Sequence, residues 1–321
     1  MADIKLICGN YEIQFESATW SGTDTQVCRQ LQFSVPYNPY DPNYKDVKVK
    51  LGDLCALYEG NKQLFVGTIT SSEQKSEIGP LSFTAKDYMV HLLRSNGTFN
   101  FKNTTAEAIT RRVCQEIGIS TSNIAETRIN IASMLVQNTS YYDIILKAYT
   151  KAYEANGIKY MPTMQGPNLS IIEKGQHCGY ELNTKNDISS SSFTQNVDNM
   201  VNKVVIYNEG GEVVGVVSND SDINSFGIYQ QVYDEEEGVN AKSAATKMLV
   251  GITRNASLEA IGNTACVSGK SISINDNEAG LTGIFWITSD SHSFSNGVHT
   301  MSLTLSFNNT METSEYEEKE W

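Results

Sequence analysis

Residues 298–307 read VHTMSLTLSF, and the regular alternation of polar and apolar side chains in this stretch indicates the fold class. The apolar members are Met301, Leu303, Leu305 and Phe307, and the hydroxyl-bearing members are Thr300, Ser302, Thr304 and Ser306. A period of two places alternate side chains on opposite sides of a β-strand. The stretch therefore predicts a strand with one dry face and one hydroxyl-rich face.

The same alternation recurs upstream, around residues 11–15, 31–35, 47–51 and 81–83. Three other segments show helical spacing instead. The first is 104–118, where Thr104 and Glu107 have the spacing of a capping box and Gly118 supplies the stop. The others are 140–157, with Ser140 as the N-cap, and about 240–251. Short amphipathic helices among many strands predict a mainly β, α+β chain.

Two parts of the chain resemble each other at an almost constant offset. Gly52 matches Gly269, and Ile69-Thr70-Ser71 matches Ile287-Thr288-Ser289. The strand Leu81-Ser82-Phe83-Thr84 matches Met301-Ser302-Leu303-Thr304. A fixed offset is the mark of an internal repeat. The sequence thus predicts two copies of one antiparallel β-unit, separated by a helical stretch.

The chain has 321 residues, and its 24 Lys and Arg stand against 37 Asp and Glu, a formal charge of −13. This acidity disfavours nucleic-acid binding through the net field. No apolar run approaches the roughly 20 residues of a spanning helix, and residues 1–10 show no secretory leader. We expect assembly in a cytoplasm without stable membrane insertion.

Metal and cofactor sites are not expected. The six cysteines are Cys8, Cys28, Cys55, Cys114, Cys178 and Cys266. They lie far apart, with no Cys-x-x-Cys pair, and we expect reduced, mostly buried thiols. Asp220-Ser221-Asp222 resembles the start of a calcium loop, but Ser225 and Gln231 replace the required Gly and Glu. A turn rich in Asx residues is the better interpretation.

Catalytic residues are not expected either. Ser289 to Ser293 contains Asp290 and His292, the residue types of a hydrolytic triad. Neighbours on one strand do not converge as a nucleophile, base and orienting acid must. Gly210-Gly211 lies between two valine-rich runs and predicts a hairpin. The acidic runs Asp234–Glu237 and Glu315–Glu320 are interpreted as solvated segments, with partner binding as the alternative.

Several motifs occur in an order that resembles a known family. Residues 64–69 (LFVGTI) resemble its "wxGxI" strand, and residues 83–87 (FTAKD), followed by Leu92-Leu93, resemble its "xAxD…L" step. Residues 104–118 are similar to its helix, and residues 200–204 (MVNKV) to its "mVN.V" strand. Residues 241–249, Gly269 and 285–301 are similar to its terminal stretch. The chain thereby resembles the XkdQ-like baseplate hub proteins of contractile phage tails and tail-derived bacteriocins, related to the late control protein D group.

The resemblance implies two tail-tube-like antiparallel β-barrels separated by a helix-containing α/β insert. The expected division is a first barrel (1–98), a middle domain (99–160), a connecting segment (161–199), a second barrel (200–311) and an acidic tail (312–321). It implies a homotrimer whose pseudo-sixfold ring joins a sixfold tail tube to a threefold central spike, in a virion baseplate or tail-like particle. Other implied partners are a baseplate wedge or LysM-type tail protein and the tape measure.

Two other functions stay open at this point. One is a tail-associated cell-wall hydrolase, although no lytic signature is visible in the sequence. The other is a carbohydrate-binding β-module, which would need clustered exposed aromatic residues and a secretion route. The negative charge has a candidate place in the ring interpretation: three chains would carry 3 × (−13) = −39 around a bore that repels passing cargo.

Overall fold

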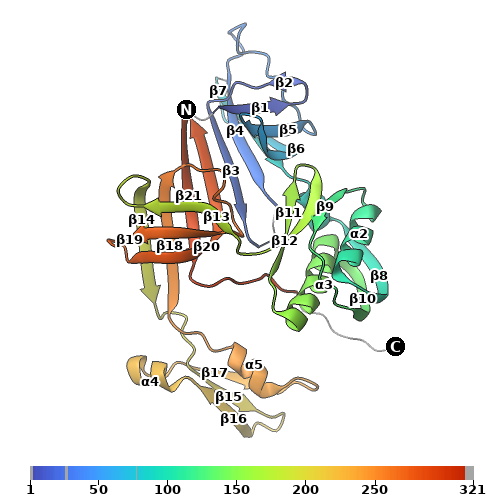
Figure 1. Cartoon of the computed structure of the whole chain (residues 1–321), viewed down its shortest axis with the longest axis vertical. Helices are drawn as coiled ribbons and strands as arrows, with labels where there is room; N and C mark the ends of the chain where they lie inside the picture. Colours follow the sequence, from blue (N-terminus) through green and yellow to red (C-terminus); the bar gives the residue numbers. More distant parts are fainter. Residues whose placement is uncertain (1–2, 26–27, 77, 315–321) are drawn as a thin grey trace. The chain divides into compact units, whose positions relative to one another are not determined.

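The computed structural model describes residues 3–25, 28–76 and 78–314 (Figure 1). The chain forms two compact units, of which the first combines Met1–Ser191 with Ser257–Trp321 and the second is Ser192–Ala256. Strands outnumber helices in both, so the mainly β class is confirmed. No helix in the described residues combines the length and the apolar character that crossing a membrane requires.

The first unit contains two sets of strands, of which β14 (Ile188–Asn196) and β18 (Thr253–Ile261) continue into the second unit. The first set is β1 (Ile4–Cys8), β2 (Tyr11–Glu12), β3 (Ser17–Thr23), β4 (Gln30–Tyr37), β5 (Leu54–Glu59), β6 (Lys62–Gln74) and β7 (Gly79–Lys86). The second set is β13 (His177–Asn183), β14 (Ile188–Asn196), β18 (Thr253–Ile261), β19 (Ser271–Asp276), β20 (Leu281–Ser295) and β21 (Val298–Ser306). Both sets belong to one 13-stranded sheet.

The two sets have the same spatial order. Strands β4-β7-β6-β5-β1 follow one another in the first, and β18-β21-β20-β19-β13 in the second. The hairpin of β3 and β4 corresponds to that of β14 and β18, between which the second unit is inserted. The sets are not two separate closed barrels: β3 pairs with β20, and no barrel closes among the described strands. Because β3 and β20 pair with each other, neither strand edge is available to close its own set into a barrel.

Backbone hydrogen bonds confirm the internal repeat. Gly52 N–H donates to the Ile69 carbonyl at 2.9 Å, and Gly269 N–H donates to the Ile287 carbonyl at 2.9 Å. Gly52 has φ +87° and Gly269 has φ +85°, a conformation that favours glycine. The offset of the sequence repeat is thus the offset of equivalent backbone positions.

A bulge follows each of these bonds at the same place. The register shifts between Ile69 and Ser71 in one half and between Ile287 and Ser289 in the other. The bulged residue is a threonine in both halves, and its hydroxyl donates at 3.2 Å to the carbonyl of a threonine on the next strand. The repeated Ile-Thr-Ser triplet therefore encodes a β-bulge, which bends the long strand.

The glycine of the "wxGxI" strand motif is Gly67 on β6, and the close approach of β7 explains why it is glycine. A Cβ atom at this position would lie 2.2 Å from the Lys86 carbonyl oxygen and 2.7 Å from the Phe65 ring. Backbone cannot move aside as a flexible side chain can, so only glycine allows β6 and β7 to approach this closely.

The helical segment between the two sets forms its own core. It comprises α1 (Met89–Arg94), β8 (Asn96–Thr104), α2 (Ala106–Glu116), β9 (Thr121–Ile124), β10 (Ile131–Ser140), α3 (Tyr141–Asn156), β11 (Tyr160–Gln165) and β12 (Asn168–Glu173). Helices α1, α2 and α3 pack with these strands around buried residues such as Ile109, Met134, Ile144 and Leu169. Figure 1 shows this segment in green beside the first set of strands.

The ends of the helices correct one expectation and confirm another. Thr105, not Thr104, caps α2, because its hydroxyl accepts from Ala108 N–H at 3.4 Å while Thr104 ends β8. Glu107 forms no capping box; it accepts from the Thr127 hydroxyl at 2.9 Å, which anchors a neighbouring loop. Ser140 caps α3 as expected, accepting from Asp143 N–H at 3.0 Å.

The second unit is a three-stranded sheet with one covering helix. Its elements are β15 (Lys203–Tyr207), β16 (Val213–Ser218), α4 (Asp220–Phe226), β17 (Gln230–Asp234) and α5 (Ala241–Lys247), and the strand order is β16-β15-β17. The expected hairpin at Gly210-Gly211 is confirmed. The expected Asx turn at Asp220 is instead helix α4, because Asn219 accepts from Asp222 N–H and caps it.

The predicted domain boundaries stay a prediction. The second unit, Ser192–Ala256, lies largely within the range expected for the second barrel, and its helix α5 begins after the Asn240 cap as predicted. The helix ends at Lys247, earlier than the predicted residue 251. The acidic run Glu315–Glu320 lies outside the described residues.

Candidate assembly site

The two sets of strands meet where β3 pairs antiparallel with β20, a contact that we call the seam. Its register runs from Ser17 opposite Ser295 to Thr23 opposite Ser289. Figure 1 shows β3 in blue against the red strands of the second set. The seam joins residues that are more than 250 positions apart in sequence, so it is the contact that turns two repeats into one body.

A buried ion pair lies beside the seam. Arg29 Nη1 donates to Asp290 Oδ1 at 2.9 Å, and Nη2 donates to Oδ2, so the contact is bidentate. The Asp290 side chain is fully buried and also accepts from Ser268 N–H at 2.6 Å. The Arg29 guanidinium lies 4.1 Å from the centroid of the Trp20 ring. Burial alone would raise the pKa of Asp290, but the charge and hydrogen bonds of the guanidinium, together with His292 and Ser268 N–H, hold this pKa below its usual range.

His292 is held in place by contacts on both of its ring nitrogens. Its Nε2 lies 3.1 Å from the Cys266 carbonyl, its Nδ1 lies 3.1 Å from His299 Nε2, and the nearest Asp290 oxygen is 3.5 Å away. Both ring nitrogens are therefore already in contact with buried neighbours, a backbone carbonyl and a second imidazole. Burial lowers the pKa of His292 to about 4, so the ring is neutral at neutral pH.

We expect acid to destabilise the protein through His292. Its folded pKa of about 4 lies below the ordinary 6.5, so the stabilisation is complete above pH 6.5 and is lost as the pH falls toward 4. The loss is roughly 3 kcal/mol over this window. Urea unfolding at pH 7 and pH 4.5 should show a smaller pH dependence for His292→Met than for the natural protein. The exposed His177→Met is the control, and an unchanged pH dependence in His292→Met would contradict the assignment.

Asp87, the acidic residue of the "xAxD" motif, joins the loop before β4 to helix α1. Its carboxylate accepts from Arg29 N–H at 3.1 Å and from Met89 N–H at 3.0 Å. Burial raises the pKa of Asp87 to about 6. The motif therefore marks a structural hydrogen-bonding residue.

A second buried ion pair joins Lys174 to Asp24 at 2.6 Å, with both side chains less than a tenth exposed. Sequence reasoning did not single out Arg29, Asp24 or Lys174. Each is an isolated charge without motif or period, and only its tertiary partner gives it a role. The one sequence signal for buried charges was the low share of charged residues, 19%, because a charge next to an apolar stretch is then more often a buried one.

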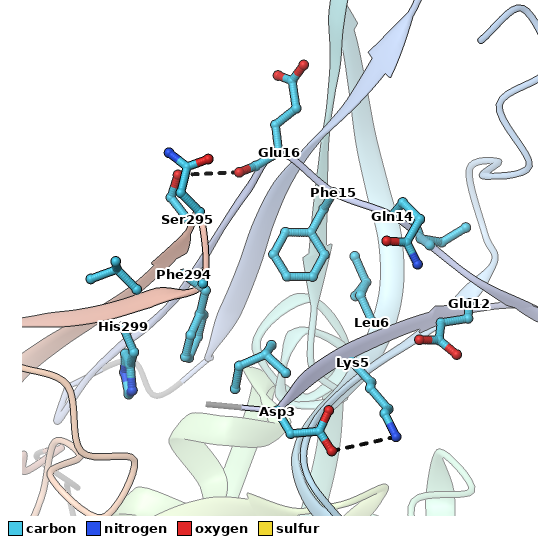
Figure 2. Close-up of a pocket in the computed structure, with 15 residues that line it drawn as sticks. Asp3, Lys5, Leu6, Glu12, Gln14, Phe15, Glu16, Phe294, Ser295 and His299 are labelled. Atoms are coloured by element: carbon cyan, nitrogen blue, oxygen red, sulfur yellow. Dashed lines mark hydrogen bonds and ion pairs between the residues drawn. The ribbon is translucent and has the colours of Figure 1, made fainter. Parts of the chain in front are cut away.

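A pocket of about 390 Å³ opens at the end of the seam (Figure 2). Its walls include Leu6, Phe15 and Phe294, and Ser295 donates to the Glu16 carbonyl across it at 3.4 Å. Figure 2 shows Asp3, Lys5 and Glu12 on its rim, with Lys5 3.7 Å from Asp3.

The cysteines are free thiols, as predicted. Cys8 lies opposite Cys55 on paired strands, with 2.8 Å between the sulfur atoms, and Cys178 lies 3.9 Å from Cys266. Burial raises the pKa of Cys28 and of Cys114 to about 12. Among the residues the structure describes, no three His, Cys, Asp or Glu side chains are grouped as a metal site would require.

Two strand edges correspond to the seam but have no strand partner among the described residues. Strand β14, equivalent to β3, ends its sheet path with β18 on one side. Strand β6, equivalent to β20, pairs with β5 only as far as Thr68, while its outer part Ser71–Gln74 pairs with β7 alone.

Comparisons with known proteins identify the class. The chain is 15% identical to the 43 kDa tail protein of prophage MuSo2 from Shewanella oneidensis, with a TM-score of 0.71 over 94% of this chain and 97% of that one. An Escherichia coli type VI secretion component, described as structurally similar to the T4 tail proteins gp27 and gp5, has a TM-score of 0.56 at 10% identity. It is matched over 98% of this chain and 79% of its own. The fold is therefore that of phage tail and baseplate proteins.

Sequence similarity defines the group more closely. The chain is 24% identical to the phage-like element PBSX protein XkdQ of Bacillus subtilis over 94% of each chain. The YQBQ-like family model matches residues 18–306. The chain belongs to the YQBQ-like family. The family resemblance noted in the sequence is thereby confirmed.

Proposed function

We propose that the protein is a non-enzymatic structural hub of a contractile tail baseplate, built as a homotrimer. The observation that carries the proposal is the seam. Within one chain, β3 of the first set pairs with β20 of the second, and the equivalent strands β14 and β6 are left with open edges. An open edge of paired-strand geometry is a template for strand addition.

In the proposed trimer, β14 of one copy pairs with the outer part of β6 of the next copy. This contact is heterologous, and it forms a closed ring when three copies complete the rotation. The ring then contains six like β-modules joined by three seams within chains and three between them. Such a ring presents approximate sixfold symmetry to a tail tube and true threefold symmetry to a central spike.

The proposed partners follow from this geometry. They are the tail tube protein and the central spike, with a baseplate wedge or LysM-type tail protein and the tape measure as further neighbours. The proposed location is the baseplate of a virion or tail-like particle, after assembly in the bacterial cytoplasm. The charge of three chains would favour a negative bore that does not retain passing cargo. A neutral or basic channel wall in the assembled particle would contradict this last point.

Mass measurement of the purified protein at native pH tests the trimer. The expected species has three times the 35.5 kDa chain mass across a tenfold range of concentration. A stable monomer at high concentration would contradict the ring.

The two alternative functions have their own tests. A tail-associated hydrolase would clear a cell-wall zymogram. We expect no clearing, because both nitrogens of the buried His292 are already engaged by His299 and by the Cys266 carbonyl. A carbohydrate-binding module would retain the protein on immobilised polysaccharide, and we expect no retention.

A further inference from the structure

The three-stranded sheet of the second unit is covered on one face only. Helix α5 packs on the face that carries Val204 and Ile206, where Ala245 is fully buried. Paired residues in neighbouring strands lie on the same face of a sheet. Val216 and Val232 both pair with Val205, so these three side chains form one row on the face opposite α5.

This opposite face is apolar and exposed. Val216 and Val232 are about half exposed, at 51% and 50%, while Val205 between them is 6% exposed. Val213, opposite Tyr207 on the same face, is 56% exposed. We call Val205, Val213, Val216 and Val232 the valine face. Contiguous exposed apolar side chains of this kind mark interaction surfaces.

Carboxylates are concentrated at one end of the valine face. Strands β15 and β17 run parallel and end together, because Tyr207 pairs with Asp234 and Glu235 N–H donates to the Tyr207 carbonyl at 2.9 Å. The turn between β15 and β16 leaves from the same end. We call these carboxylates the acidic rim: Glu209, Glu212, Asp234, Glu235, Glu236 and Glu237. Among the described residues they form no ion pair, so their charge is available to a partner.

We propose that the valine face and the acidic rim bind an amphipathic helix of a partner protein, with aliphatic residues along one stripe and Lys or Arg at one end. Two strand spacings span about 10 Å, which matches the width of one helix. A helix laid on this face would complete a three-layer unit and remove the exposed valines from water. Basic residues at one end would meet the acidic rim. This proposal is independent of the trimer, because none of its residues lies on β14 or β6.

The test uses the full-length protein and two labelled synthetic helical peptides of 18 residues. Both carry the same leucine stripe; one carries lysines in its last two turns and the other glutamates. Fluorescence anisotropy should show binding of the lysine peptide that weakens between 50 and 300 mM salt, as screening of the rim predicts. Hydrogen exchange should be slowed in β15, β16 and β17 by the lysine peptide.

Val216→Asp should weaken the lysine peptide at least tenfold, and Val216→Ser should weaken it about threefold without risk to the fold. Ile261→Asp, at an equally exposed position of the first unit, is the matched control and should bind as the natural protein does. Changing Glu235, Glu236 and Glu237 to Lys should reverse the preference between the two peptides. The proposal is overturned if the lysine peptide fails to bind, if both peptides bind equally, or if Val216→Ser and Val216→Asp leave the affinity unchanged.

Discussion

Replacing Asp290 with Ala is expected to lower the free energy of unfolding by about 3–5 kcal/mol. The change leaves the Arg29 guanidinium buried beside Trp20 without its counter-charge, and it removes the acceptor of Ser268 N–H. Loss of one partner of a buried pair costs more than the pair contributes, because the remaining charge is unpaired. Urea unfolding at pH 7 and a fixed protein concentration measures the effect.

Two further variants separate the buried charge from a general effect of mutation. Glu116→Ala removes one partner of an exposed ion pair, with Arg112 3.3 Å away, and should change the stability by less than about 0.5 kcal/mol. Replacing Arg29 with Met and Asp290 with Leu together should recover most of the lost stability, since no unpaired charge remains. A loss below 1 kcal/mol in Asp290→Ala would show that the pair does not stabilise the seam.

Ser192→Pro is expected to convert the proposed trimer into a folded monomer. Ile261 N–H donates to the Asp187 carbonyl at the start of the β14 and β18 hairpin. Antiparallel bonds recur at every second residue, so Ser191 faces β18 and Ser192 directs its N–H to the open edge. Proline at the open edge removes an outward donor and blocks strand addition, while it leaves the bonds to β18 intact.

The measurement is native mass together with thermal unfolding. Ser192→Pro should have the mass of one chain and a circular dichroism spectrum like that of the natural protein. Ser191→Pro removes a bond within the chain, so it should lower the thermal stability, which distinguishes the two positions. A trimer that persists in Ser192→Pro would exclude β14 from the contact between copies.

Much of the fold follows from local patterns. Alternation along residues 298–307 predicted β21. The two Ile-Thr-Ser triplets predicted that Ile69 and Ile287 occupy equivalent positions in the two repeats, and their hydrogen bonds to Gly52 and Gly269 confirm this. These features depend on the period of a strand and on backbone bonds between neighbours. The extent of α2 was nearly correct, while its cap was misplaced by one residue, since Thr104 and Thr105 offer the same hydroxyl.

The candidate site was predicted less well. The sequence showed Asp290 and His292 as neighbours, but not that Arg29 reaches Asp290. The open edges of β14 and β6 depend on which strands pair, and pairing between distant segments leaves no local signal. The exposure of the valine face could not be predicted either, because the valine-rich sequences of β15 and β16 are compatible with a sheet covered on one face or on both.

The β-rich class, the repeat with its offset, and the family resemblance can all be read from the order of the residues. These depend on residue type and spacing, which the chain carries locally. Long-range packing is needed to join the two repeats through β3 and β20, to place Arg29 against Asp290, and to leave one sheet face of the second unit open. Each of these arises when distant segments exclude water from a shared contact, and such a contact is selected by the packing of the whole chain.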